Sequence, residues 1–116
     1  MVLTKSFMYV VKCSDDTLYV GYTTNILRRL EVHNAKKGAK YTKSRVPVIL
    51  KYYEEFLTKS EAIKREYAFK QLKKENKLAY IQENLTQEKK NYIKEINAKL
   101  KEKNNAVFST NTNRKP

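Results

Sequence analysis

Two short runs of strand-forming residues, joined by a turn, stand near the start of the chain and constrain its fold more than any other feature. Residues 7–11 and 17–22 are rich in valine and tyrosine, which favour extended backbone. Between them, Ser14, Asp15 and Asp16 carry the short polar side chains that are common in turns. Two such runs with a short polar connection predict a β-hairpin.

The pattern changes from strand to helix directly after this hairpin. Thr23 and Thr24 can cap a helix that runs from 25 to about 36. The segment 36–45 is rich in lysine and contains no acidic residue, so we expect a charged loop there. Residues 48–56 have the composition of a third strand.

The second half of the chain has a helical pattern that fades into a polar end. Thr58 and Glu61 have the spacing of a capping box, which predicts a helix from 58 to about 74. Residues 85–103 predict a further basic, amphipathic helix that Thr86 can cap, and the polar stretch 104–116 predicts a disordered tail. The order β-β-α-β-α-α predicts an α+β fold, with a small three-stranded antiparallel sheet flanked by helices and a C-terminal helical extension. This extension either covers the domain or serves dimerisation or nucleic-acid contact, so we expect a monomer or a weak homodimer.

The excess of positive charge narrows the possible partners. The 116 residues include 25 Lys and Arg against 12 Asp and Glu, a formal net charge of +13. Such an excess is typical of nucleic-acid binding, although a basic protein without such a partner has the same composition. One cysteine and one histidine exclude a disulfide framework and a closed zinc site. No apolar run is long enough for a membrane span or a signal peptide, which predicts a cytoplasmic protein with no membrane partner.

Several residues with chemical potential are spaced so that the predicted fold brings them together. They are Tyr9, Tyr19, Gly21, Arg29, His33 and Glu66. The two tyrosines lie in successive strands of one hairpin, and the arginine and histidine are four residues apart on one helix face. These residues also have ordinary interpretations. The tyrosines can be core residues, His33 can be an exposed helix residue, and Glu66 can be a solvated carboxylate paired with Lys70.

The same residues resemble motifs of the GIY-YIG nuclease superfamily. Residues 7–9, Phe-Met-Tyr, stand where the family has Gly-Ile-Tyr, and residues 19–21, Tyr-Val-Gly, stand where it has Tyr-Ile-Gly. The segment 25–30 resembles the family's first helix, whose arginine corresponds to Arg29.

Later segments extend this resemblance. Residues 38–47 are similar to the linker of small stand-alone bacterial members and of structure-selective junction nucleases. Residues 62–67 resemble the segment that holds the family's metal-binding glutamate. The similarity covers roughly residues 5–82, which makes 1–84 a GIY-YIG-like nuclease domain.

The resemblance implies a metal-dependent DNA endonuclease with a specific set of catalytic residues. Glu66 would hold a single Mg²⁺ or Mn²⁺, and Arg29 would donate hydrogen bonds to the phosphate. Tyr9 would orient or deprotonate the attacking water, for which neighbouring cations would have to lower its pKa. Tyr19 would bind the phosphate or the water, and His33 would assist proton transfer or hold the phosphate.

Basic residues close to the predicted site are expected to bind the DNA backbone. They are Arg28, Lys36, Lys37, Lys40, Lys43 and Arg45. Phosphate contacts position a duplex without reading its sequence, so we expect selection by structure, as in branched, flapped or nicked DNA during repair or recombination. A non-catalytic nucleic-acid-binding module with the same fold is one alternative, and a protein bound to RNA is another.

Overall fold

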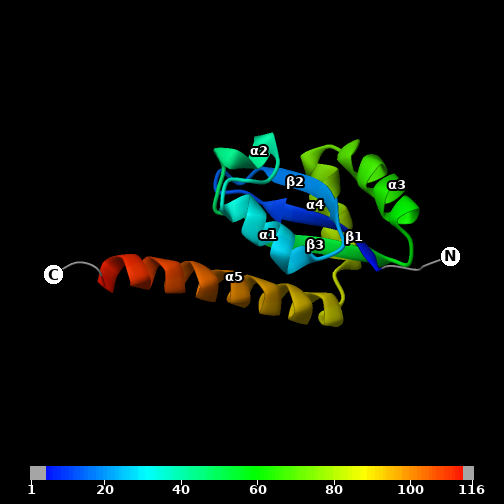
Figure 1. Ribbon diagram of the computed structural model, residues 1–116. Helices are drawn as coiled ribbons and strands as arrows, with labels where there is room; N and C mark the ends of the chain where they lie inside the picture. Colours follow the sequence, from blue (N-terminus) through cyan, green and yellow to red (C-terminus); the bar gives the residue numbers. More distant parts are fainter. Residues whose placement is uncertain (1–4, 114–116) are drawn as a thin grey trace.

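A three-stranded antiparallel sheet lies at the centre of the molecule (Figure 1). The computed structural model describes the backbone of residues 5–113 and the side chains of residues 5–102. The strands are β1 (Ser6–Lys12), β2 (Leu18–Thr23) and β3 (Ile49–Phe56), and their order across the sheet is β2-β1-β3. The hairpin and the third strand are therefore confirmed.

Helices cover both faces of this sheet. They are α1 (Ile26–Asn34), α2 (Lys40–Lys43), α3 (Lys59–Lys70), α4 (Lys74–Asn84) and α5 (Gln87–Asn113). One face packs against α1 and α5, the other packs against α3 and α4, and the C-terminal part of α5 extends past the rest of the molecule (Figure 1). The predicted α+β architecture is confirmed. In the part of the chain that is described, no helix is both long and apolar enough to cross a membrane.

Alternation along the central strand supplies both halves of the core. Tyr9 and Val11 lie in the cluster that includes α1 and α5, while Met8 and Val10 lie in the cluster with α3 and α4. Asn97 joins α5 to β3, because its Oδ1 accepts from the Leu50 N–H at 2.8 Å and its Nδ2 donates to the Leu50 carbonyl at 3.0 Å. The part of α5 around Asn97 is thus packed against the sheet as part of the domain.

The helix caps agree with the sequence in two places and differ in one. Thr58 accepts from the Glu61 N–H at 3.2 Å, and Thr86 accepts from the Lys89 N–H at 3.2 Å, so both predicted caps are confirmed. The cap of α1 is Asn25, whose side chain accepts from the Arg28 N–H at 3.1 Å. The prediction of Thr23 or Thr24 was wrong because β2 continues through residue 23 and α1 begins only at Ile26, which puts Asn25 at the cap position.

Three predicted boundaries are corrected. The segment 36–45 is not loop throughout, because α2 forms inside it around a buried Thr42. The helix expected to reach 74 ends at Lys70, and the chain turns so that α4 packs on the same face of the sheet as α3. The tail expected from 104 continues the helix of α5 to Asn113, since no proline or glycine interrupts a helix that is already formed. The end of that expected tail, residues 114–116, lies outside the described residues.

Candidate active site

The site lies at the outer edge of β2, where a missing side chain makes room for a tyrosine ring. Gly21 is paired directly with Tyr9 of the neighbouring strand. A Cβ atom added at Gly21 would lie 2.7 Å from Cε2 of Tyr9, closer than such atoms approach. The ring of Tyr9 therefore lies across β2, and the absence of a side chain at Gly21 makes room for it.

Helix α1 brings an imidazole and a guanidinium to the Tyr9 hydroxyl. His33 Nε2 lies 2.7 Å from Tyr9 Oη, and Arg29 Nε donates to the same oxygen at 3.4 Å. Both side chains reach it because residues four apart on a helix share a face. The structure thus brings together three of the five predicted catalytic residues in direct contact.

A second hydrogen bond fixes the far side of the imidazole. His33 Nδ1 lies 2.8 Å from Thr42 Oγ1, and the Thr42 hydroxyl donates to the Ala39 carbonyl at 3.0 Å. Tyr9, His33 and Thr42 all have 0% exposure. The interpretation of His33 as an exposed helix residue is therefore wrong, and a buried imidazole cannot hold a phosphate directly.

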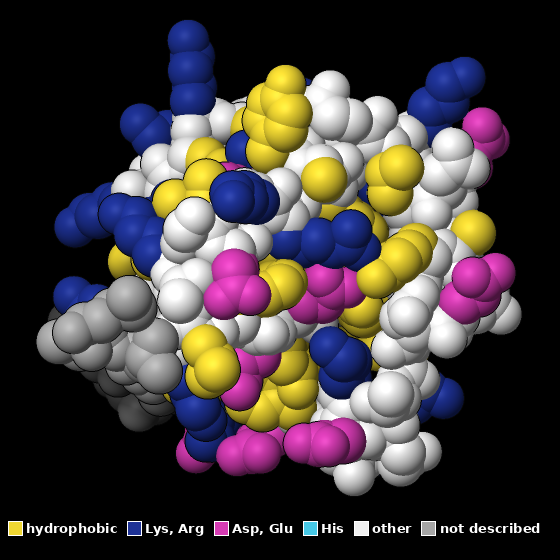
Figure 2. Space-filling model, turned by 90° about the vertical axis from the view of Figure 1, so that its right-hand side faces the viewer, with side chains coloured by type: hydrophobic (Ala, Val, Ile, Leu, Met, Phe, Trp, Pro, Cys, Tyr) yellow, Lys and Arg dark blue, Asp and Glu magenta, His cyan; other side chains and the backbone are white. Residues whose placement is uncertain are grey.

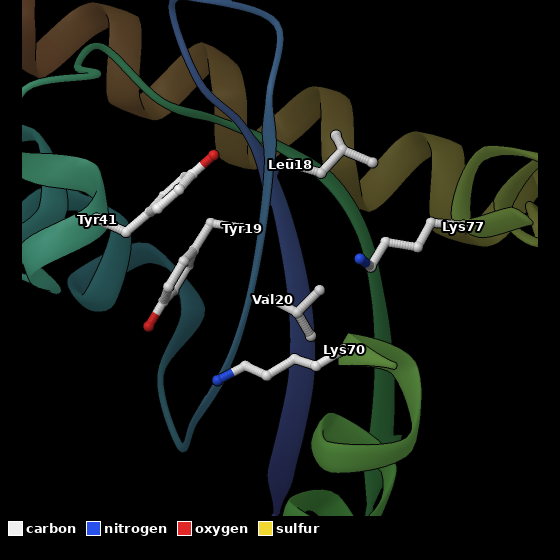
Figure 3. A pocket seen from close by; sticks show the side chains of 6 residues that line it. All are labelled: Leu18, Tyr19, Val20, Tyr41, Lys70 and Lys77. Atoms are coloured by element: carbon white, nitrogen blue, oxygen red, sulfur yellow. The ribbon is translucent and has the colours of Figure 1, made fainter. Parts of the chain in front are cut away.

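Tyr19 joins the site through its ring. Its ring makes an edge contact with His33 at a centroid distance of 5.5 Å and stacks with Tyr41 at 6.0 Å. The ammonium of Lys70 lies 5.6 Å from the centre of the Tyr19 ring and extends from α3 toward β2 (Figure 3). These groups border an open cavity of about 340 Å³. Its lining residues are Leu18, Tyr19, Val20, Tyr41, Lys70 and Lys77.

Glu66 approaches the same place from α3. Its side chain is 20% exposed and pairs with Lys70, whose Nζ lies 3.5 Å from Glu66 Oε2. Its charge acts on Tyr9, because Glu66 is among the groups that raise the pKa of that phenol. The predicted pairing with Lys70 is therefore present, and Glu66 lies close enough to Tyr9 for its charge to act on the phenol.

The donor set decides which metal ions the site fits. Among the described side chains no cluster of three or more His, Cys, Asp or Glu residues can enclose a metal. A single carboxylate next to open space suits Mg²⁺, which keeps several waters and takes one or two carboxylates together with phosphate oxygens. Glu66 fits that requirement and does not fit a closed cage.

Burial, and not charge, sets the protonation of the buried pair. Burial raises the pKa of Tyr9 to about 12, and the nearby Arg29 guanidinium offsets this only in part. Arg29 does lower this pKa, as expected of a neighbouring cation, but burial has the larger effect. Burial, and then the Arg29 charge, lowers the pKa of His33 to about 4. Both side chains are neutral at pH 7, and the imidazole has a free lone pair.

The predicted basic surface divides into free and engaged side chains. Arg28, Lys36, Lys37, Lys40 and Lys43 are exposed. Arg45 is half-buried: it bonds Asp15 Oδ2 at 3.1 Å and the Tyr41 carbonyl at 2.8 Å, and its guanidinium covers the Tyr41 ring at 4.0 Å. Arg45 therefore holds Tyr41 in place.

The charge is not spread evenly over the surface. The face turned toward the viewer in Figure 2 carries basic and acidic side chains together, with hydrophobic ones between them. The segment 36–45, in contrast, has no acidic residue. A polyanion that approaches this segment meets basic side chains and no carboxylate of the segment itself.

A second polar cluster, which the sequence did not reveal, lies on the other side of α3. Glu54 accepts hydrogen bonds from Tyr52 at 2.7 Å and from Tyr80 at 3.0 Å, and it pairs with Arg65 Nε at 2.7 Å. These hydrogen bonds, with that of Arg65 first, hold the pKa of Glu54 below its usual range despite burial. The cluster fastens α3 and α4 to β3.

Sequence reasoning missed Thr42, Tyr41 and Lys70 as members of the site. Thr42 and Tyr41 lie in a segment whose lysines dominate its pattern, and the single signal for them is that the segment resembles a family linker. Lys70 was considered only as a partner of Glu66. Its position over Tyr19 depends on where α3 crosses the sheet edge.

Comparison with known proteins gives a consistent family assignment. Residues 5–79 match the family model of the GIY-YIG catalytic domain. A UPF0213 protein of Staphylococcus haemolyticus is 53% identical over 81 residues, which cover 70% of this chain and 99% of that protein. A UPF0213 protein of Streptococcus agalactiae is 52% identical over 83 residues, which cover 72% of this chain and 94% of that protein.

Solved structures of similar proteins also match. The solution NMR structure of a UPF0213 protein of Bacillus halodurans is 36% identical and covers 69% of this chain and 85% of its own, with a TM-score of 0.46. A solution NMR structure of an E. faecalis protein is 42% identical and covers 71% of this chain and 88% of its own, with a TM-score of 0.48. On the family match over residues 5–79, this chain belongs to the GIY-YIG nuclease superfamily.

Proposed function

We propose that this chain is a metal-dependent DNA endonuclease that hydrolyses phosphodiester bonds and selects its substrate by structure and not by sequence. The observation that carries the proposal is the convergence of Tyr9, His33 and Arg29 at one hydroxyl, next to the carboxylate of Glu66. Hydrolysis of a phosphodiester needs a water that loses a proton and a site that neutralises added negative charge. The four side chains supply both.

The buried pair accounts for proton removal. As a water attacks phosphorus, it gives a proton to the Tyr9 oxygen while Tyr9 gives its own proton to His33 Nε2 at 2.7 Å. The phenol stays neutral throughout, which matters because the raised pKa of Tyr9, about 12, disfavours a free phenolate. The imidazolium that forms is stabilised by the negative phosphate.

Arg29 is placed to bind that phosphate. Its guanidinium is always charged and offers a planar set of donors, and its Nε already lies 3.4 Å from the Tyr9 oxygen. Tyr9 has no exposed surface, so water reaches its hydroxyl only when a neighbouring side chain moves. We assign this movement to Arg29, whose guanidinium group turns toward the phosphate. Tyr19, which is half-buried beside His33, donates to the phosphate or to the water.

Glu66 would hold the divalent cation, with Mg²⁺ or Mn²⁺ as the ion. When bound, the ion supplies positive charge that neutralises the phosphate and its leaving oxygen. Lys70 pairs with Glu66 at 3.5 Å in this structure and is released when Glu66 takes its ligand. The freed ammonium then faces the cavity next to Tyr19.

Exposed basic residues would bind the DNA backbone. One segment beside α1, without acidic residues, carries four exposed lysines: Lys36, Lys37, Lys40 and Lys43. Arg28, on α1 itself, is a fifth exposed basic residue. Such contacts carry no sequence information, which supports selection by DNA structure, as in branched, flapped or nicked DNA. We place this activity in repair or recombination in the cytoplasm, and we assign it to a monomer or a weak homodimer. Each lysine changed to glutamine should reduce the slope of log affinity against log salt by about 0.9.

A cleavage assay tests the proposal. The purified protein is incubated with branched, flapped and linear DNA, in Mg²⁺, in Mn²⁺ and in EDTA. Wild type should cut only with metal, and Tyr9→Phe, Arg29→Ala and Glu66→Gln should each lose about 10²-fold or more in rate while retaining most of their DNA binding.

Matched controls use side chains of the same type away from the site. Tyr67→Phe on the exposed face of α3 and Glu83→Gln on α4 should cut like wild type. Equal cleavage by Glu66→Gln and Glu83→Gln would identify a contaminating nuclease and refute the assignment.

A non-catalytic binding module is the second candidate, and the full burial of Tyr9 favours it. The test uses the three DNA substrates and an RNA duplex, each with either metal. Salt-dependent binding without cleavage of any of them would show that the protein is a non-catalytic binding module.

A further inference from the structure

Thr42 is a buried polar residue inside a segment that is otherwise exposed and basic. Its neighbours Lys40, Tyr41 and Lys43 are exposed, whereas Thr42 has 0% exposure. A buried hydroxyl is kept in a fold only with its hydrogen bonds made. The direction of those hydrogen bonds shows what Thr42 does.

The Thr42 hydroxyl has one proton, and the direction in which it points determines which ring nitrogen of His33 carries a proton. Thr42 Oγ1 donates to the Ala39 carbonyl at 3.0 Å, so the same oxygen must accept at its contact with His33 Nδ1 at 2.8 Å. His33 therefore carries its proton on Nδ1. Its Nε2 is bare and accepts from the Tyr9 hydroxyl at 2.7 Å.

We propose that Thr42 is a positioning residue that holds His33 in the Nδ1–H tautomer, so that Nε2 is free to receive the proton of Tyr9. The role of Thr42 in turnover rests on the proposed function, because it serves the proton transfer assigned there to Tyr9 and His33. The tautomer itself does not rest on it.

The tautomer depends on Thr42 because the alternative tautomer is otherwise available. Without the hydroxyl, an Nδ1–H group would be buried with no acceptor, which a protein avoids. The proton would move to Nε2 and point at the Tyr9 oxygen. A nitrogen that already has a proton cannot accept another, so Tyr9 could no longer transfer its proton to His33.

The backbone of the same segment keeps the imidazole in this position. A Cβ added at Gly38 would lie 3.0 Å from both Cε1 and Cγ of His33. The chain therefore passes against the ring itself, with Thr42 four residues further on, inside α2. This packing leaves the Thr42 hydroxyl as the neighbour that contacts Nδ1.

The single histidine of the chain makes the tautomer directly measurable. Long-range ¹H–¹⁵N NMR spectra of ¹⁵N-labelled protein at pH 7 distinguish the protonated ring nitrogen from the bare one. Wild type should show Nδ1–H, Thr42→Ser should retain it, and Thr42→Val should convert it largely to Nε2–H. An Nε2–H tautomer in wild type would overturn the inference, and so would an unchanged Nδ1–H tautomer in a folded Thr42→Val.

Cleavage rates then connect the tautomer to the reaction. Thr42→Val should lower kcat by about 10²-fold with little change in KM, and Thr42→Ser should restore most of the rate. A Thr42→Val protein that shows the Nε2–H tautomer and still cuts like wild type would overturn the positioning role. If wild type cuts nothing, the proposed function fails, while the NMR spectra still decide whether Thr42 sets the tautomer.

Discussion

Acidification should destabilise this fold through His33, and the size of the effect follows from its burial. The pKa of the imidazole falls from 6.5 to about 4 on folding, because burial and the Arg29 charge disfavour the imidazolium. As the pH falls, the unfolded chain binds the proton first. The stabilising contribution is therefore complete above pH 6.5 and is lost progressively between pH 6.5 and 4. At about 1.4 kcal/mol per pKa unit, the loss is about 3 kcal/mol.

Urea unfolding followed by circular dichroism at pH 7, 6, 5 and 4 measures this loss. His33→Gln is the control, because it carries no titrating proton but keeps every carboxylate of the chain. The difference in unfolding free energy between wild type and this variant should shrink by about 3 kcal/mol from pH 7 to 4. The NMR signal of the single histidine should titrate near pH 4 in the folded protein. A midpoint near 6.5, with parallel stability curves for the two proteins, would show that the imidazole is not buried as described and would refute the reasoning.

Three further substitutions test other parts of the structure. Gly21→Ala should push Tyr9 out of place, lower stability by about 1–3 kcal/mol in urea unfolding and reduce cleavage; an unchanged protein would show that the Tyr9 ring does not lie against Gly21. Lys36→Gly should raise the unfolding free energy by about 1 kcal/mol, since Lys36 has a φ of +63°, which glycine adopts without cost; a loss of stability would contradict this. Arg65→Met should lower stability at pH 7 by about 2 kcal/mol in the same assay, because Glu54 is 15% exposed and loses its cation; no change would place the pair among ordinary surface pairs.

The parts of the fold and site that could be predicted follow short-range rules. Strand-forming runs separated by a turn predict a hairpin, and a hairpin places Tyr9 opposite Gly21. Spacing by four residues places Arg29 and His33 on one helix face. Their meeting at one hydroxyl needs only that α1 follows the hairpin and packs on the nearer face of the sheet.

The parts that could not be predicted depend on contacts between distant segments. In the sequence, Thr42 is one polar residue among lysines, and nothing in its neighbourhood predicts burial. It is buried because α2 folds against His33. Glu54 and Arg65 lie on different elements, and neither has a local pattern that predicts the other. The raised pKa of Tyr9 also results from burial in three dimensions, whereas the sequence suggested only the nearby cations.

The geometry of the site is set by the width of the sheet, through two adjacent residues of α3. Residues next to each other on a helix point in directions about 100° apart, so Arg65 and Glu66 serve different sides of α3. Arg65 fixes the helix to Glu54 on β3, at one edge of the sheet. Helix α3 contacts all three strands, and it carries Glu66 close enough to the Tyr9 phenol for the carboxylate charge to raise the pKa of that phenol. The separation of carboxylate and phenol is therefore fixed by strand spacing and helix packing, while the exposed lysines of segment 36–43 remain free to follow the shape of a nucleic-acid backbone.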